Sequence, residues 1–572
     1  MKKKIGLLLL ASFAVFSLTS CADFLYSLIG GDTINQSSQN SGSSSQTNPS
    51  SSSSGEQSQD SGHSSSSGSG SSSSSSSSSS TPDVNPIEAK KANSTYMDYI
   101  ENNVYPISST PCVGSARILV IPVWFTDSST FIKSSTNKAN VKSDIETAYF
   151  GTNDATGWRS VRTYYEEESF QNLSITGTVS DWYECNYSYS RFTKDDDTSK
   201  TVSLIQEATD WYFRTHSSEN RRNYDCDHDG YLDGVMVIYG APDYGTWGRD
   251  SYDNLWAYCF WTQDYQSCNP NTPGVNAFFW ASYDFMYGSN TVSKRAGSSY
   301  AGGDTTYCTL DAHTYIHEMG HMFGLDDYYD YSSNGYSPAG SFSMQDANVG
   351  GHDPFSSYAL GWGKAYVPTE SMTIELKPFA TSGEMILLSP SYNSYKSPFD
   401  EYLLIEYYTP TGLNKFDTDH PYRSGYSYPT GSKQSGIRLW HVDARLAYTS
   451  TGTFSSSKIT TNPSISNNWV TLAMTNTSND KSIDEQYLSP LGSDFYNYNL
   501  LQMIRNSTSA TYKAKDNMSS NTLFKAGDSF SMGTYGRQFV NTGKLDTNKD
   551  LGFTFTVDAI NSNQATITIN KL

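Results

Sequence analysis

The chain contains 572 residues, of which 58 are acidic and 38 are basic, and its formal net charge is −20. This acidic balance argues against nucleic acid as a partner, because a phosphate backbone attracts basic surfaces, and it is typical of a soluble surface in an extracellular setting. The length allows several domains.

The first 21 residues have the pattern of an export signal. Three lysines precede an apolar run from Ile5 to about Leu18, which is too short for an ordinary membrane-spanning helix. The segment 18–21, Leu-Thr-Ser-Cys, resembles the lipobox of bacterial lipoproteins, in which Cys21 becomes the lipidated first residue. A plain cleaved signal is the alternative. No later segment is a candidate for a membrane-spanning helix. We therefore expect an extracytoplasmic protein that is attached to the cell membrane only through a lipid anchor at Cys21, unless it is shed or secreted.

A flexible tether is expected over residues 22–88. From Gln36 to Ser80 the sequence is nearly all Ser, Gly, Gln and Asn. Such a composition cannot bury enough apolar surface to offset the entropy of ordering. The expected organisation is therefore a signal (1–21), a tether (22–88), a catalytic domain (89–366) and a β-rich region of one or two modules (367–572).

Strand and helix patterns alternate between residues 117 and 239. Apolar or alternating runs predict strands at 117–125, 173–179 and 235–239, and helical patterns lie at 161–166 and 203–213. This alternation predicts an α+β or α/β fold class. By contrast, residues 240–303 are rich in Tyr, Trp, Gly and Asp and look too irregular for a compact layer. They are expected either to shape a substrate cleft or to form a surface excursion.

The strongest chemical signal is the run from His317 to Asp327. His317 and His321 are four residues apart, so on a helix both imidazoles point the same way, and Glu318 lies beside them as a general base. Gly324 lets a helix end and the chain turn back, so that Asp327 can supply a third ligand and leave an open position for water. This set predicts a catalytic zinc site.

Other assignments stay open for this run. Asp326 and Asp330 are nearby oxygen donors that compete with Asp327 for the third position. His313 also lies four residues from His317, but it lacks an adjacent base, and we interpret it as a supporting or packing histidine. The bland alternative is a histidine pair that packs a helix without metal.

A second metal-binding pattern precedes the strand at 235–239. Carboxylates at alternate positions and a glycine for a sharp turn suit a hard cation with several oxygen ligands, which favours calcium. Met236 stands where an EF-hand would carry its bidentate glutamate, so further ligands would come from elsewhere. A solvated acidic turn is the alternative. The candidate calcium ligands are Asp225, Asp227, Asp229 and Asp233.

Six cysteines follow Cys21, and none of them matches a cysteine-ligated zinc pattern. They allow about fifteen pairings, of which Cys259–Cys268 is the first to test because the two are close in sequence. Cys112 could occupy the zinc in a latent form, but a disulfide or a buried thiol is the favoured role.

The sequence pattern changes along the region after the histidine motif. Residues 341–346 suggest a tight turn beneath the metal, and Asp353-Pro354 opens a helix through Leu360. From about residue 367, short β-type runs such as 402–408, 436–442 and 565–569 alternate with Gly, Asn, Ser and Pro turns. This pattern predicts a sandwich-like region.

Six separate segments carry a common likeness: residues 160–165, 175–179, 225–233, 317–327, 353–362 and 439–443. Together they resemble the immune inhibitor A family of secreted bacterial metallopeptidases, which are zincins of the metzincin type. The resemblance implies a zincin domain that hydrolyses peptide bonds of extracellular proteins or peptides, here in a cell-attached form that is presumed monomeric. It also implies roles for individual residues: zinc ligation by His317, His321 and Asp327, base catalysis by Glu318, and a Met-turn at Met344.

A surface adhesin is the competing hypothesis, in which the same scaffold binds glycans or host protein through aromatic patches. The aromatic share is 14%, and sugars stack on aromatic rings, but the intact His-Glu-His set argues against a dead enzyme. A Ser/His/Asp hydrolase is weaker still, because no nucleophile-elbow pattern accompanies the histidines.

Overall fold

The computed structural model describes residues 84–95, 110–192, 199–243, 255–262, 268–287, 309–330, 336–390, 397–420, 429–449, 459–460, 469–477 and 498–572. The expected export signal, the lipidation candidate Cys21 and nearly all of the expected tether lie outside these residues. Among the helices that are described, none combines the length and the apolar character needed to cross a lipid bilayer.

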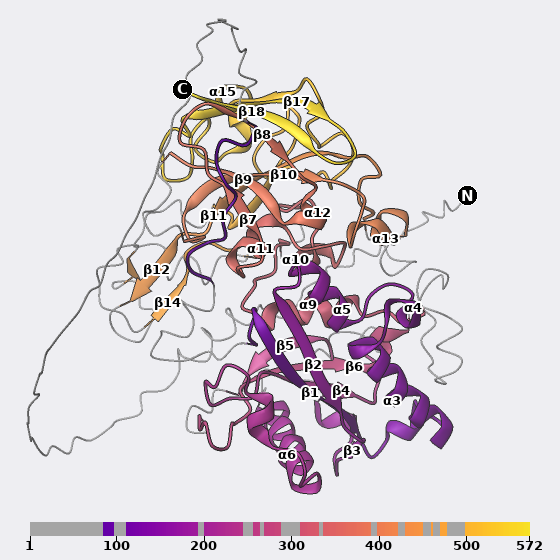
Figure 1. The fold of residues 1–572 in the computed structure, drawn as a ribbon. Helices are drawn as coiled ribbons and strands as arrows, with labels where there is room; N and C mark the ends of the chain where they lie inside the picture. Colours follow the sequence, from indigo (N-terminus) through magenta and orange to yellow (C-terminus); the bar gives the residue numbers. More distant parts are fainter. Residues whose placement is uncertain are drawn as a thin grey trace, which may run out of the picture.

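A mostly parallel sheet forms the centre of the amino-terminal half (Figure 1). Its strands run in the order β2-β1-β4-β6-β5, and β3 also pairs with β1. Strand β1 lies inside the sheet because its Ile, Leu and Val side chains exclude water from both faces. Strand β5 is antiparallel to β6 and ends the described order. The bounds are β1 Gly114–Trp124, β2 Leu173–Val179, β3 Tyr183–Glu184, β4 Val235–Tyr239, β5 Tyr258–Trp261 and β6 Ala277–Ser282.

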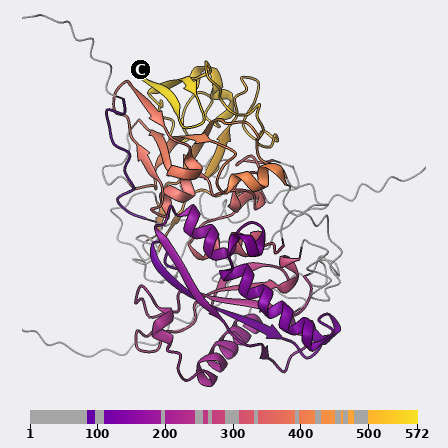
Figure 2. The same ribbon diagram turned by 45° about the vertical axis from the view of Figure 1, so that its right-hand side comes forward.

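Helices flank this sheet, as the alternating sequence pattern predicted (Figures 1 and 2). Helix α5 begins at a capping box. The Ser160 side chain accepts a hydrogen bond from the backbone N–H of Thr163, and the Thr163 side chain accepts one from the backbone N–H of Ser160. It packs against β2 and against α9, the helix that carries the histidine motif. The bounds are α3 Ser135–Phe150, α4 Asn153–Thr156, α5 Val161–Glu168, α6 Ser199–Thr215 and α9 His313–Met322.

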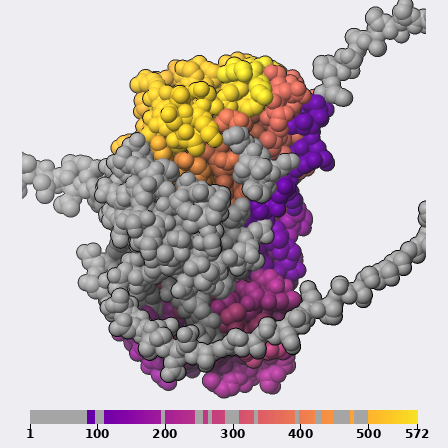
Figure 3. All heavy atoms as spheres, turned by 90° about the vertical axis from the view of Figure 1, so that its left-hand side faces the viewer, coloured from indigo at the N-terminus to yellow at the C-terminus, as the bar shows by residue number. Residues whose placement is uncertain are grey.

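Two further sheets pack face to face in the carboxy-terminal half, which lies at the other end of the molecule (Figures 1 and 3). One has the order β15-β11-β10-β9-β7 and the other β16-β17-β18-β8, and Leu403 and Leu439 of the first share a core with Ile374 and Phe555 of the second. The runs 402–408, 436–442 and 565–569, which were expected to be strands, lie in these two sheets. The bounds are β7 Lys364–Tyr366, β8 Met372–Leu376, β9 Glu384–Leu388, β10 Glu401–Tyr408, β11 Gly436–Asp443, β15 Leu501–Ile504, β16 Ser529–Phe530, β17 Phe553–Ile560 and β18 Ala565–Lys571.

A separate core joins the five-stranded sheet to the chain that follows α9. It contains Tyr402 and Trp440 from the sheet and Phe355 and Tyr358 from α11. Pro354 opens α11, and the Asp353 side chain caps it, as predicted from the sequence. The remaining elements are α10 Met344–Ala347, α11 Pro354–Ala359, α12 Phe379–Ser382, α13 Asn414–Asp419, α15 Met532–Tyr535, β12 Leu446–Thr449, β13 Ile459–Thr460 and β14 Trp469–Leu472.

The expectation that residues 240–303 form no compact layer is wrong for two parts of that region. They supply β5 and β6 to the main sheet, and every residue of β6 is buried. The run Ala-Phe-Phe-Trp-Ala-Ser is apolar enough to fill an interior strand next to β4. Cys259 lies in β5 and Cys268 at the surface, and both are thiols, so they do not form a disulfide with each other.

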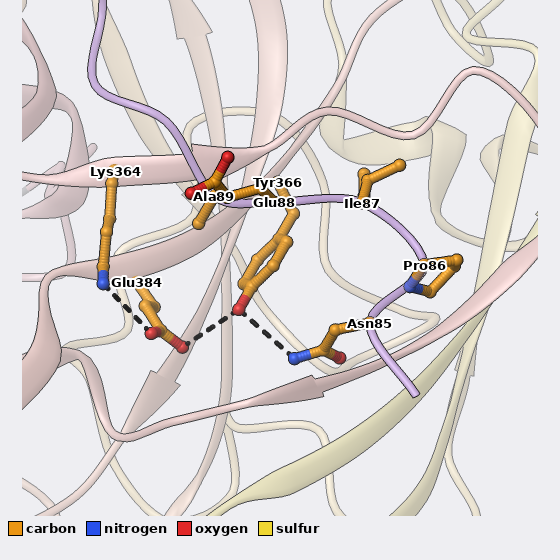
Figure 4. Close-up of a pocket in the computed structure, with 8 residues that line it drawn as sticks. All are labelled: Asn85, Pro86, Ile87, Glu88, Ala89, Lys364, Tyr366 and Glu384. Atoms are coloured by element: carbon orange, nitrogen blue, oxygen red, sulfur yellow. Dashed lines mark hydrogen bonds and ion pairs between the residues drawn. The ribbon is translucent and has the colours of Figure 1, made fainter. Parts of the chain in front are cut away.

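The described amino-terminal segment, residues 84–95, lies along the carboxy-terminal half (Figures 1 and 2). Lys90 forms an isolated β-bridge with Ala365 of β7. Farther upstream, Asn85 Nδ2 donates to the hydroxyl of Tyr366 at 3.2 Å, and the segment lines an open pocket beside β7 and β9 (Figure 4). The first described residues of the chain therefore lie against the carboxy-terminal half.

Candidate metal centre

The histidine motif forms α9, and all ten residues of this helix are buried. His317 and His321 lie one turn apart on it, with their Nε2 atoms 3.1 Å from each other. Each Nδ1 atom lies 2.7 Å from a backbone carbonyl, which is that of Met344 for His317 and that of Leu325 for His321. A carbonyl can only accept, so these contacts hold the tautomer with Nδ1–H and leave both Nε2 lone pairs facing the same point.

The turn after α9 brings a carboxylate to these two nitrogens. Gly324 has φ +98°, a left-handed conformation that favours glycine, and its N–H donates to the carbonyl of His321 at 2.8 Å. The returning chain places Asp327 Oδ1 3.1 Å from His317 Nε2 and 3.3 Å from His321 Nε2. The ligand atoms of this His/His/Asp group lie within 4.8 Å of one another. Two competing carboxylates are only partly buried and lie outside the group: Asp326 and Asp330.

The chain beneath α9 is a short helix, α10, rather than the tight turn expected from the sequence. Met344 opens it, is fully buried, and supplies the carbonyl that orients His317. The next residue, Gln345, packs directly on Gly320, where an added Cβ would meet Gln345 Oε1 at 2.2 Å. A side chain at residue 320 would therefore require the buried Gln345 side chain to move.

Glu318 lies beside the two histidines and is almost completely buried. Burial raises the pKa of its carboxyl above the ordinary value, while His321 and His317 work in the opposite direction. A backbone hydrogen bond from Cys259 of β5 also favours the charged form. The carboxylate is thus held next to the group without belonging to it.

His313 turns away from the group and supports α9 from its amino-terminal end. Its Nδ1 lies 2.7 Å from Oδ1 of Asp311 and its Nε2 lies 3.1 Å from Oδ1 of Asp417. The ring stacks on Trp158 with centroids 3.9 Å apart and planes within 7°. Burial lowers the pKa of His313, but Asp417 and Asp311 outweigh it and raise the pKa to about 9. This contact set agrees with the supporting role expected from the sequence.

The acidic loop before β4 gathers three of its four candidate carboxylates. Ligand oxygens of Asp225, Asp227 and Asp229 lie within 4.8 Å of one another, and Asp225 Oδ1 is buried without a hydrogen-bond partner among the described residues. Burial, reinforced by the neighbouring carboxylates, raises the pKa of Asp229 to about 8. Asp233 lies outside the group, because its oxygens accept the backbone N–H groups of Arg117 at 2.6 Å and of Cys226 at 2.7 Å.

Cys112 does not lie in the His/His/Asp group. It is buried, its thiol donates to the carbonyl of Leu360 at 3.6 Å, and its own carbonyl accepts from the indole of Trp362 at 2.6 Å. In this structure Cys112 is a packed thiol and does not occupy the metal position.

A third group was not singled out from the sequence. Glu401, His441 and Asp546 are all buried, and their ligand atoms lie within 4.8 Å of one another. The sequence signal is weak, because Asp546 follows His441 by more than a hundred residues and carries no local pattern that points to it.

Comparisons with known proteins indicate a distant relationship to a protease. No protein-family model matches the chain. Two curated proteins match it, both named "Pre-pro-metalloprotease PrtV", from Vibrio cholerae serotype O1 strains M66-2 and ATCC 39315 / El Tor Inaba N16961. Each is 25% identical over 233 residues, which is 35% of this chain and 23% of the relative, so the chain spans less than a quarter of their length. The chain is thus distantly related to a metalloprotease, and the metal that such a protease requires has a candidate group in α9 and the turn after it.

Proposed function

We propose that the chain is a zinc-dependent endopeptidase with a zincin-type catalytic domain, acting on extracellular proteins or peptides at the bacterial cell surface. The observation that carries this proposal is the convergence of His317, His321 and Asp327 with Glu318 at their side. The distant likeness to a metalloprotease supports it.

The donor set fits zinc. Two imidazoles and one carboxylate are a common ligand set of catalytic zinc, and three protein ligands leave a fourth position open. When bound, zinc would supply a Lewis acid that polarises the scissile carbonyl. His317 and His321 are already oriented for ligation by the carbonyls of Met344 and Leu325.

Glu318 supplies the proton transfers in this proposal. Its carboxylate would accept a proton from the attacking water and deliver it to the leaving amine. Burial, which raises its pKa, makes it a stronger base than an exposed glutamate.

Protein or peptide substrates are proposed because the distant relative is named a metalloprotease.

Calcium is proposed for the loop of Asp225, Asp227 and Asp229. The three carboxylates lie close together, and one of them has a buried oxygen without a hydrogen-bond partner among the described residues. A hard cation that takes many oxygen ligands would stabilise this arrangement. Asp233 would then stabilise the loop through backbone contacts instead of ligating the ion.

Export and lipid attachment at Cys21 are proposed from the sequence pattern of residues 1–21. They place the enzyme outside the cytoplasm, on the membrane surface.

The decisive experiment compares Glu318→Gln with the wild type and with Glu370→Gln, a matched change at an exposed position. Casein hydrolysis and zinc content are measured on the same preparations. We expect Glu318→Gln to keep its zinc and to lose activity by roughly 10²- to 10⁴-fold, while Glu370→Gln retains both. Undiminished hydrolysis by Glu318→Gln would refute the proposal.

A further inference from the structure

A buried group of one histidine and two carboxylates lies between the carboxy-terminal sheets. Glu401 and His441 are 3% and 2% exposed, and Asp546, in the loop before β17, is 7% exposed. His441 Nε2 lies 2.9 Å from Glu401 Oε1. The backbone N–H groups of Asp546 and Thr547 donate to the two oxygens of Glu401, so the loop is pinned to β10.

Strand register places this group on the side of the sheet away from α9. Glu401 and Leu403 of β10 pair with Asp443 and His441 of β11, so all four share one face. Leu403 belongs to the core between the two carboxy-terminal sheets, whereas Trp440, on the opposite face, packs toward the chain that follows α9. The group is therefore separate from the one that holds His317.

One oxygen of the group lacks the partner that its burial requires. Asp546 Oδ1 is buried and has no hydrogen bond to any residue that the structure describes. A buried carboxylate oxygen without a partner costs free energy, because it has lost water and gained nothing in return. A cation between Asp546, His441 and Glu401 would supply that partner.

Charge balance points to a divalent ion. Asp443 is neutralised by Arg445, whose Nε and Nη2 lie 2.7 and 2.6 Å from its two oxygens. Glu401 and Asp546 remain, and with a neutral imidazole they carry two negative charges. A divalent cation would balance these two charges.

We propose that Glu401, His441 and Asp546 hold a second, structural zinc ion in the carboxy-terminal half. An imidazole ligand favours zinc over calcium, and two carboxylates with one imidazole are donors that zinc accepts. The ion fastens the loop at Asp546 to β10 and β11, and thereby joins the four-stranded sheet to the five-stranded one.

The test counts zinc in the full chain, dialysed with excess calcium so that oxygen-only sites are filled. We expect about two zinc ions in the wild type and about one in His317→Ala/His321→Ala, which leaves this group intact. Adding Asp546→Asn to that double variant should remove the remaining ion, whereas adding Asp550→Asn should not. Asp550 lies in the same loop and its side chain is 82% exposed, which makes it a matched control.

A second measurement does not depend on altering the group. Zinc is titrated into the His317→Ala/His321→Ala chain by calorimetry. We expect about one zinc ion bound per chain and a zinc-dependent rise in the unfolding temperature. A folded double variant that binds no zinc, or an ion that stays after Asp546→Asn, would overturn the proposal.

Discussion

His313 Nε2 lies 3.1 Å from Asp417 Oδ1, and this contact joins the start of α9 to α13. The other oxygen of Asp417 accepts the backbone N–H of Gly350 at 2.6 Å. One buried carboxylate therefore fixes both the metal-site helix and the chain that follows α10. The position of the candidate ligands thus depends on the region after them.

Replacing Asp417 by Asn should destabilise the fold. The change keeps the shape of the side chain but removes a charge that faces a buried imidazolium, so we expect the free energy of unfolding to fall by about 3 kcal/mol. Asp419→Asn, two residues later in α13, is the control, because Asp419 pairs with Lys433 at the surface and both side chains are more than half exposed. Urea unfolding measures both variants; equal effects would argue against a buried ion pair at His313.

The same contact makes stability depend on pH. Burial lowers the pKa of His313, but Asp417 and Asp311 raise it from 6.5 to about 9. A group whose pKa is raised by folding contributes fully below its unfolded pKa, and the contribution is lost as pH rises through the folded pKa. Stability should therefore decline between about pH 6.5 and 9, by up to about 3 kcal/mol from this histidine. The decline should be smaller in Asp417→Asn, and identical pH profiles for the two proteins would contradict this account.

Gly320→Ala should disturb the metal group from beneath. The new Cβ would meet Gln345 Oε1 at 2.2 Å, so the buried Gln345 side chain would have to move, next to the Met344 carbonyl that orients His317. We expect a loss of about 1–3 kcal/mol in stability and weaker zinc binding. Gly533→Ala in α15 is the control, since its nearest neighbour would be Ser531 Oγ at 3.8 Å. Zinc affinity that is the same in both variants would show that α10 does not hold the histidine.

Calcium should stabilise the wild type through the acidic loop. Without a cation, burial raises the pKa of Asp229 to about 8 and that of Asp227 to about 6. Binding an ion in place of protons should therefore stabilise the loop. We expect calcium to raise the unfolding temperature of the wild type by several degrees, and this rise to vanish in Asp227→Ala. Asp210→Ala, at a largely exposed position of α6, should keep the response. A calcium response that survives Asp227→Ala would remove this loop as the site.

Local patterns predicted the elements whose signal lies in a short stretch of sequence. The strands at 173–179 and 235–239 were predicted with the bounds that the structure gives. Strand β6 was missed because its apolar run is embedded in Tyr-, Gly- and Asp-rich sequence. Helix α3 was missed because its buried residues begin only at Val141, while its first turn is polar.

The candidate sites show the same limit. His317, Glu318 and His321 can be predicted from the sequence because a helix fixes their spacing, and Asp327 lies in the turn that follows this helix. The partner of His313 cannot be predicted from a local pattern, since Asp417 lies 104 residues away. The group of Glu401, His441 and Asp546 is assembled by strand register and a distant loop, which no short pattern encodes.

The docking of residues 84–95 decides how a pull on the chain is transmitted. Lys90 is bridged to Ala365 of β7, and Asn85 Oδ1 accepts the backbone N–H of Glu375 of β8 at 2.6 Å. Tension applied upstream of residue 84 is therefore carried first by the carboxy-terminal sheets. The force therefore acts on these sheets first, and it reaches α9 and its histidines only after the sheets unfold.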